Sequence, residues 1–170
     1  MGAVYFYHLT RSPVEDAVAM LAGRALEAGW RVAVRLREPA RAAWLDAALW
    51  QGAGDGFLAH GLAGGAHDDL QPVLLTTGAL PAGRACLMAL DGAEVGPDET
   101  SQAERVCILF DGTDDAAVQV ARGQWKALTG AGLPAQYFSE ESGRWQKKAE
   151  AGGEAGAVGE AGATPQASRD

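Results

Sequence analysis

The first fifty residues alternate twice between a short apolar run and an amphipathic segment. Residues 4–9 and 31–36 are dominated by apolar side chains, many of them β-branched or aromatic, which is typical of buried strands. The segments that begin at Ser12 and Glu38 carry their apolar residues at helical spacing. This strand–helix–strand–helix order predicts a parallel sheet whose strands are joined by crossover helices.

The first of these helices has clear boundary signals in the sequence. We expect Ser12 to be its N-cap, Pro13 its first residue and Glu15 the acidic partner of Ser12 in a capping box. Gly29 follows the last apolar residue at helical spacing, so we expect it to end the helix.

The rest of the chain continues the pattern with longer interruptions. Further strands are predicted at residues 73–76, 85–90, 106–110 and 133–138, and further helices at residues 38–50 and 114–130. Residues 51–71 are rich in Gly and Ala and are expected to be mostly loop. The predicted fold class is α/β, with a mostly parallel sheet flanked by helices.

The last twenty-one residues differ in composition from the rest. Residues 150–170 are dominated by Gly, Ala and Glu, contain no aromatic residue and carry four acids against one base. Such a segment buries too little apolar surface to offset its ordering entropy. We therefore expect one α/β domain over residues 1–149 and a disordered Gly/Ala/Glu-rich tail over residues 150–170.

The charge balance excludes two classes of partner. The formal net charge is −8, from 14 Lys and Arg against 22 Asp and Glu. A protein that clamps nucleic acid needs a broad basic face to displace counterions from phosphates, and a protein that binds anionic lipids needs a polybasic segment. We therefore expect no membrane partner and no extended contact with DNA.

The sequence also indicates a compartment. No apolar run approaches the roughly 18 residues that span a bilayer, and the N-terminus lacks the pattern of a secretory signal. Cys86 and Cys107, the two cysteines, lie in separate apolar runs and are expected to be buried free thiols. The expected location is the cytoplasm.

The usual nucleotide-binding signatures are missing. The loop over residues 61–67 has the glycines of a phosphate-binding loop but lacks its lysine. The turn over residues 8–13, after the first strand, has no glycine to let a pyrophosphate approach the backbone. We therefore predict no nucleotide-binding motif and no cofactor.

One segment resembles a phosphatase motif in part. Residues 110–113 match the end of the DxDGT pattern, but Leu109 stands where that chemistry needs a nucleophilic aspartate. We interpret Asp111 as a turn and helix-capping residue. A phosphate-handling α/β hydrolase that uses Asp111 with His60 and His67 is kept as the alternative function.

No metal site is predicted. His60, His67, Asp68 and Asp69 fit no zinc-ligand spacing and lie in a Gly-rich segment. His60 is expected to bind a backbone group, and the two aspartates are expected to be solvated.

The last predicted helix carries a pair of bases beside an aromatic residue. Arg122 and Lys126 are four residues apart and share a helix face, with Trp125 next to them. Two interpretations stay open: the bases complement the carboxyl end of the helix dipole, or an anion binds between them.

Aromatic residues gather at the end of the second predicted helix. Trp44, Trp50 and Phe57 belong either to the core or to a protein interface, where rigid rings contribute much of the binding energy.

Together these features resemble the chi subunit of the bacterial DNA polymerase III holoenzyme, a clamp-loader accessory protein. The resemblance covers residues 3–149. It is carried by Phe6-Tyr7, by Gly29 before Arg31-Val32, by an LDxxLW over residues 45–50, by an FxxHxLxG over residues 57–64, by Gln71-Pro72-Val73 and by the helical segment 121–127. It implies a Rossmann-like α/β domain that is not an enzyme and has no catalytic residue, cofactor or metal.

The resemblance also implies a partner at the last helix. Chi subunits bind the acidic C-terminal tail of single-stranded DNA-binding protein, and the matching residues here are Arg122, Trp125 and Lys126. Tyrosine is common in the family at the position of Trp125, and Val118 is apolar where the family is partly basic. DNA would be contacted only through this partner.

A second implied surface holds the psi subunit where the organism has one. The aromatic residues that match it are Trp50 and Phe57. The acidic tail lies outside the resemblance, and two roles stay open for it: a spacer, or a weak competitor for the basic site at Arg122 and Lys126.

Overall fold

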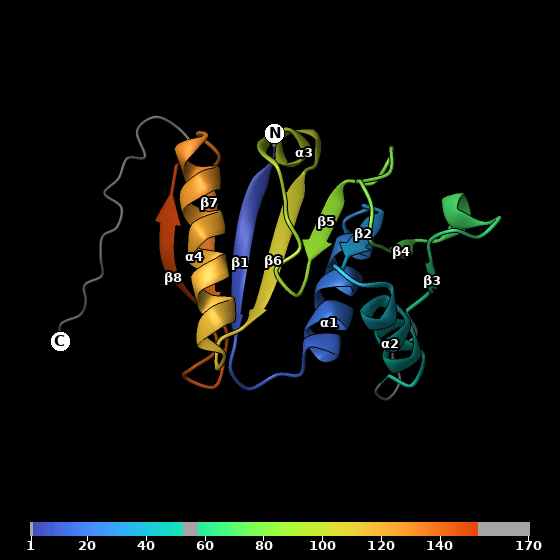
Figure 1. The fold of residues 1–170 in the computed structure, drawn as a ribbon, viewed down its shortest axis with the longest axis horizontal. Helices are drawn as coiled ribbons and strands as arrows, with labels where there is room; N and C mark the ends of the chain where they lie inside the picture. Colours follow the sequence, from blue (N-terminus) through green and yellow to red (C-terminus); the bar gives the residue numbers. More distant parts are fainter. Residues whose placement is uncertain (1, 53–57, 153–170) are drawn as a thin grey trace.

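One twisted sheet runs through the molecule (Figure 1). The computed structural model describes residues 2–52 and 58–152. Its strands are β1 (Ala3–Leu9), β2 (Val32–Arg35), β3 (His60–Leu62), β4 (Val73–Thr76), β5 (Cys86–Ala89), β6 (Arg105–Asp111), β7 (Ala135–Ser139) and β8 (Gln146–Ala151). Their spatial order is β3-β4-β2-β5-β6-β1-β7-β8, and among them only β8 is antiparallel to its neighbour.

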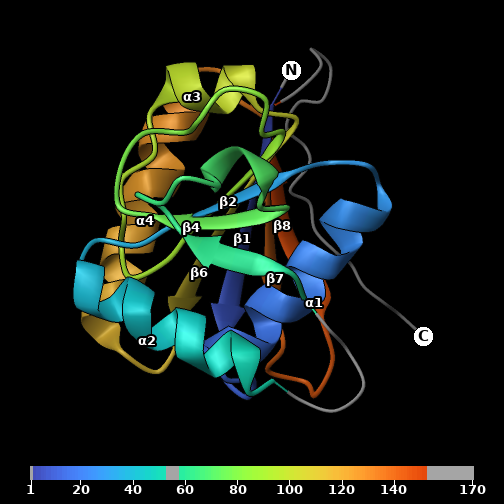
Figure 2. The ribbon, with the colours of Figure 1, turned by 90° about the vertical axis from the view of Figure 1, so that its right-hand side faces the viewer.

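Helices cover both faces of this sheet, so the domain has three layers. The helices are α1 (Val14–Glu27), α2 (Pro39–Trp50), α3 (Pro97–Gln102) and α4 (Asp115–Gly130). Figure 2 shows α1 and α4 on opposite sides of the sheet. The α1 and α2 side buries alternate strand residues that include Val34, Met88 and Leu109, and the α4 side buries the intervening ones, including Phe6 and Ile108.

This architecture confirms the predicted fold class. The predicted strands at 4–9, 73–76, 85–90 and 106–110 and the three predicted helices are present within a residue or two of their expected ends. Gly29 has a φ of +86° just after α1, as its role as a helix stop requires. Cys86 and Cys107 are free and buried.

The predicted capping box at Ser12 is wrong. The N-cap of α1 is Pro13, and no side chain caps the helix. The Ser12 hydroxyl donates instead to Glu140 Oε1 at 2.7 Å, a residue 128 positions away. A long-range carboxylate therefore replaces the local cap.

Four elements were missed in the sequence, one of them the 3-10 helix η1 (Asp68–Leu70). β3 is three residues long within the segment expected to be loop, α3 is a single polar turn and a half, and β8 has the polar sequence QKKAEA. β8 is an edge strand whose residues are almost all exposed, so no apolar alternation marks it. Glu150 and Ala151 belong to β8, and the tail residues 153–170 lie outside the described residues.

Candidate functional site

The structure brings together the three residues predicted on the last helix. Asp114 caps α4, because its Oδ1 accepts from the Ala116 amide at 2.9 Å. Arg122 and Lys126 are exposed one turn apart, and Trp125 between them is half-buried. No carboxylate of residues 2–52 or 58–152 forms an ion pair with either base. Two cations beside an aromatic ring are therefore available to an external anion.

Trp125 is fixed by the sheet beneath it. Its ring packs on Phe6 of β1 at a centroid distance of 5.3 Å and meets Tyr137 of β7 in a T-shaped contact at 6.1 Å. Val118, one turn before Arg122, is also half-buried on this side of the sheet. Trp125 thus forms a rigid aromatic wall rather than a freely rotating side chain.

Tyr137 is a site residue that the sequence reasoning missed. Burial raises the pKa of Tyr137, and the positive charge of Arg122 opposes that rise. The Tyr137 hydroxyl lies 3.2 Å from His8 Nδ1, and the His8 ring stacks on Phe110 at 5.2 Å. The sequence did predict a strand at 133–138, which contains Tyr137. It could not show that Tyr137 lies beside Trp125, because that follows from the pairing of Tyr137 with Phe6 in the sheet.

The turn before α4 is built around His8. An added Cβ on Gly112 would lie 1.7 Å from His8 Cδ2, so only glycine lets the backbone cross this ring. The turn between β6 and α4 therefore packs against His8, whose ring contacts the Tyr137 hydroxyl.

The second predicted surface is described only in part. Trp50 lies on the last turn of α2 with 53% of its surface exposed, and its ring is 4.3 Å from that of His60. Leu62 of β3, also exposed, follows His60 in the chain. Phe57, the other predicted member, lies outside the described residues.

His60 has a structural role, as expected. Its ring is buried, with Nδ1 2.8 Å from the Leu58 carbonyl oxygen and Nε2 3.1 Å from that of Asp46. These contacts fix the chain that follows α2 against the end of that helix and support the ring of Trp50.

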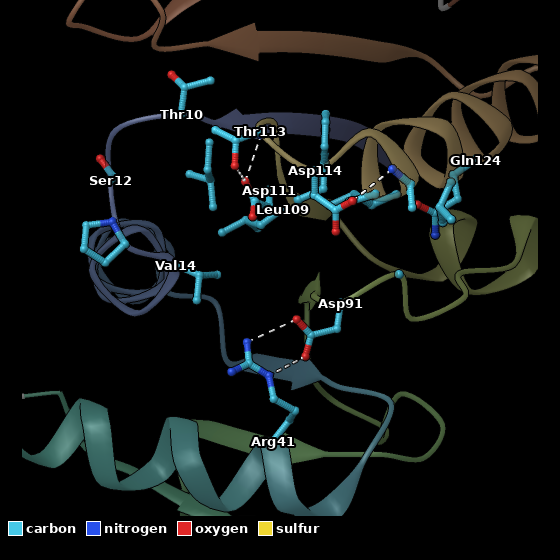
Figure 3. Close-up of a pocket in the computed structure, with 18 of the residues that line it drawn as sticks. Thr10, Ser12, Val14, Arg41, Asp91, Leu109, Asp111, Thr113, Asp114 and Gln124 are labelled. Atoms are coloured by element: carbon cyan, nitrogen blue, oxygen red, sulfur yellow. Dashed lines mark hydrogen bonds and ion pairs between the residues drawn. The ribbon is translucent and has the colours of Figure 1, made fainter.

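A cavity of about 730 Å³ opens at the carboxyl ends of β1 and β6 (Figure 3). In open α/β sheets this is where ligands bind, because the connections from the two strands leave on opposite faces. Asp111 lies at its rim with its Oδ1 accepting from the Thr113 amide at 2.9 Å and the Thr113 hydroxyl at 2.6 Å. These hydrogen bonds lower the pKa of Asp111. Asp111 is a turn residue, as predicted, whereas the helix cap is Asp114.

The anion position beside this cavity is already filled. Glu140 Oε2 accepts from the amides of Thr10, Arg11 and Ser12 at 3.0, 2.8 and 2.7 Å. Consecutive amides in the loop that leads from a strand into a helix are groups that bind phosphate in nucleotide-binding α/β proteins. The chain therefore supplies its own carboxylate at the place where such proteins hold a ligand.

The geometry opposes the alternative hydrolase. Strand register aligns His60 with Arg105 at the opposite end of β6 from Asp111, and four strand spacings separate β3 from β6. The two side chains are therefore more than about 20 Å apart. His67 is exposed at the β3 side of the sheet, so Asp111, His60 and His67 do not meet at one substrate.

In the part of the chain that the structure describes, no group of three or more His, Cys, Asp or Glu side chains could hold a metal ion. Asp68 accepts from the amides of Gly64 and Gly65 at 2.9 and 3.0 Å. Among the helices of residues 2–52 and 58–152, none has the length and apolar character to cross a membrane.

Comparison with known proteins identifies the family. The family model described as DNA polymerase III chi subunit, HolC, matches residues 1–136, four-fifths of the chain. A search of curated proteins found no match. Members of this family are accessory, non-catalytic subunits of DNA polymerase III, which act in replication. The chain belongs to the DNA polymerase III chi subunit family.

Proposed function

We propose that this protein bridges the clamp loader of the DNA polymerase III holoenzyme to single-stranded DNA-binding protein, by binding that protein's acidic C-terminal tail on α4. The observation that carries the proposal is the group formed by Arg122, Trp125 and Lys126. Two cations with no ion-pair partner in the described part of the chain flank a ring that the sheet holds in place.

Each part of this group suits a different part of the tail. Carboxylates of the tail accept charge-assisted hydrogen bonds from Arg122 and Lys126. An aromatic residue at the end of the tail packs against Trp125, with Tyr137 and Val118 as the neighbouring walls. Because Trp125 and Tyr137 are already ordered, little side-chain entropy is lost on binding.

A second partner is proposed at the end of α2. Trp50 is exposed and matches the psi-binding surface, and Phe57 is assigned to that surface by the resemblance alone. We propose that a psi subunit, where present, docks here and connects the chain to the clamp loader. DNA is then reached only through single-stranded DNA-binding protein, and the protein works in the cytoplasm.

Titration of the full chain with the tail peptide of the host's single-stranded DNA-binding protein tests the proposal. We expect micromolar binding, about 8 kcal/mol. Arg122→Ala and Lys126→Glu are each expected to weaken it, with the larger loss at low salt because these charges are exposed and screened by ions. Isothermal calorimetry of the wild type and each variant at two salt concentrations measures these affinities.

Arg37→Ala and Arg37→Glu are the matched controls. Arg37 is exposed like the two site bases but lies on the strand β2 side, near the other flank of α4. The site assignment fails if the Arg37 variants weaken binding as much as the α4 variants do.

A further inference from the structure

A second cationic feature lies on the sheet face opposite α4, at the beginning of β6. The guanidinium carbon of Arg105 is 4.2 Å from the ring centroid of Tyr5 and 5.2 Å from that of Trp30. Its Nε is buried and has no hydrogen-bond partner. Within residues 2–52 and 58–152 no carboxylate forms an ion pair with it. Two rings thus hold a cation whose charge is not neutralised.

Further aromatic rings and a second arginine lie on the same face of the sheet as Arg105. Tyr5 packs on Phe138 at 5.5 Å, and Phe138 stacks on the buried ring of Tyr7 at 5.3 Å, so the aromatic cluster continues across β1 and β7. Burial raises the pKa of Tyr7, and the charges of Arg105 and Arg24 oppose that rise; Arg24 lies on α1, the helix that packs on this face of the sheet. Arg24 is exposed and has no ion-pair partner in the described residues.

The chain leaves the described structure at this end of the sheet. Ala151 of β8 pairs with Ala135, Ala135 pairs with Val4, and Arg105 pairs with the adjacent Ala3. Three strand spacings, roughly 14 Å, therefore separate the end of β8 from Arg105. Residues 153–160 span up to about 26 Å when extended and so reach it easily.

The segment that follows has the complementary charge. Residues 153–170 contain Glu154, Glu160 and Asp170 against Arg169. Both glutamates occur within the first eight of these residues, where the other side chains are Gly and Ala apart from Val158.

We infer that residues 153–160 dock on the Arg105 surface, defined by Tyr5, Arg24, Trp30 and Arg105, with Glu154 and Glu160 paired to the two guanidinium groups. Arg105 loses less side-chain freedom on pairing than the bases of α4 do, because Tyr5 and Trp30 already hold it. The acidic segment then lies on the α1 side of the sheet. It leaves Arg122 and Lys126 open to an external acidic peptide.

A spin label in the segment tests this inference with the full chain. Ala157→Cys provides a single accessible thiol, because Cys86 and Cys107 are only 2% and 3% exposed. With a nitroxide attached, we expect selective loss of amide signal at Tyr5 and Arg105 and of the Trp30 indole signal at low salt. Signals from Arg122 and Lys126 are expected to keep their intensity.

Two sets of variants provide the controls. Glu154→Lys with Glu160→Lys leaves the described domain untouched and is expected to abolish the selective loss, as is Arg105→Gln. Lys126→Gln is expected to leave it unchanged. The inference is overturned if the label broadens α4 instead, if no signal is lost selectively, or if the loss persists after both glutamates are replaced. These outcomes are independent of whether the α4 surface binds single-stranded DNA-binding protein.

Discussion

Glu140→Ala is expected to lower the free energy of unfolding by about 3 kcal/mol, because it leaves several polar donors without their charged acceptor. The carboxylate accepts three backbone amides and the Ser12 hydroxyl, and Glu140 is only 4% exposed. Burial by itself raises the pKa of Glu140, but these hydrogen bonds outweigh it and hold the pKa below its ordinary value. Thermal unfolding should shift down by roughly 6–12 °C.

Two variants separate this contact from a general effect of charge. Glu140→Gln keeps an oxygen for the amides but loses the charge, so its loss of stability should be intermediate. Glu141→Ala removes an exposed carboxylate next in the chain and should cost little. Equal losses for Glu140→Ala and Glu141→Ala would contradict the assigned role of the carboxylate.

Small anions provide a direct test of how the contact works. The amides of residues 10–12 remain in place when the Glu140 side chain is shortened, so added formate should raise the melting temperature of Glu140→Ala more than that of the wild type. A rise of the same size in both would mean that formate acts on the whole protein and not at these donors.

This contact explains how a fold common among nucleotide-binding enzymes serves an accessory subunit. The strand arrangement creates the cavity, and the amides of the loop between β1 and α1 create the anion position. The loop between β7 and β8 then fills that position with Glu140. Glu140 also anchors the end of β7, the strand that carries Tyr137 to the side of α4.

Local patterns were sufficient to group part of the candidate site. Arg122 and Lys126 lie one turn apart on α4 and Trp125 lies three residues after Arg122, so their closeness follows from helical periodicity. Tyr137 and Glu140 reach the residues they contact only through the pairing of β7 with β1, across more than a hundred residues. No local spacing encodes that register, and the resemblance carried no motif for it.

The wrong capping box at Ser12 shows the same limit. A Ser-Pro-Val-Glu sequence satisfies every local requirement for a cap. In the structure the Ser12 hydroxyl donates to the charged carboxylate of Glu140, a charge-assisted hydrogen bond that is stronger than the neutral one a cap would accept from a backbone amide. Helix α1 itself was predicted correctly, because its apolar face does not depend on which group the Ser12 hydroxyl binds.

Arg35→Met is expected to have a comparably large effect on stability, on the α4 side of the sheet. Arg35 is 8% exposed and forms a double contact with Glu99 of α3, with Nη1 2.9 Å from Oε1. It also donates to the carbonyl oxygens of Gly78 and Glu94 at 2.8 Å, which joins α3 to two loops. Removing one partner leaves a partly buried carboxylate unpaired, at a cost of about 3 kcal/mol.

The pH dependence identifies the ion pair as the cause. The hydrogen bond from Arg35 lowers the pKa of Glu99 to about 2, well below its ordinary value. A depressed folded-state pKa stabilises the protein above the ordinary pKa, and this contribution is lost as pH falls from about 5 towards 2. In Arg35→Met the pKa returns upward, so the stability gap between the variant and the wild type should narrow in acid. Urea unfolding of both proteins at neutral pH and at about pH 3 measures the gap, and a gap that stays constant would show that Arg35 acts through packing and its carbonyl contacts rather than through Glu99.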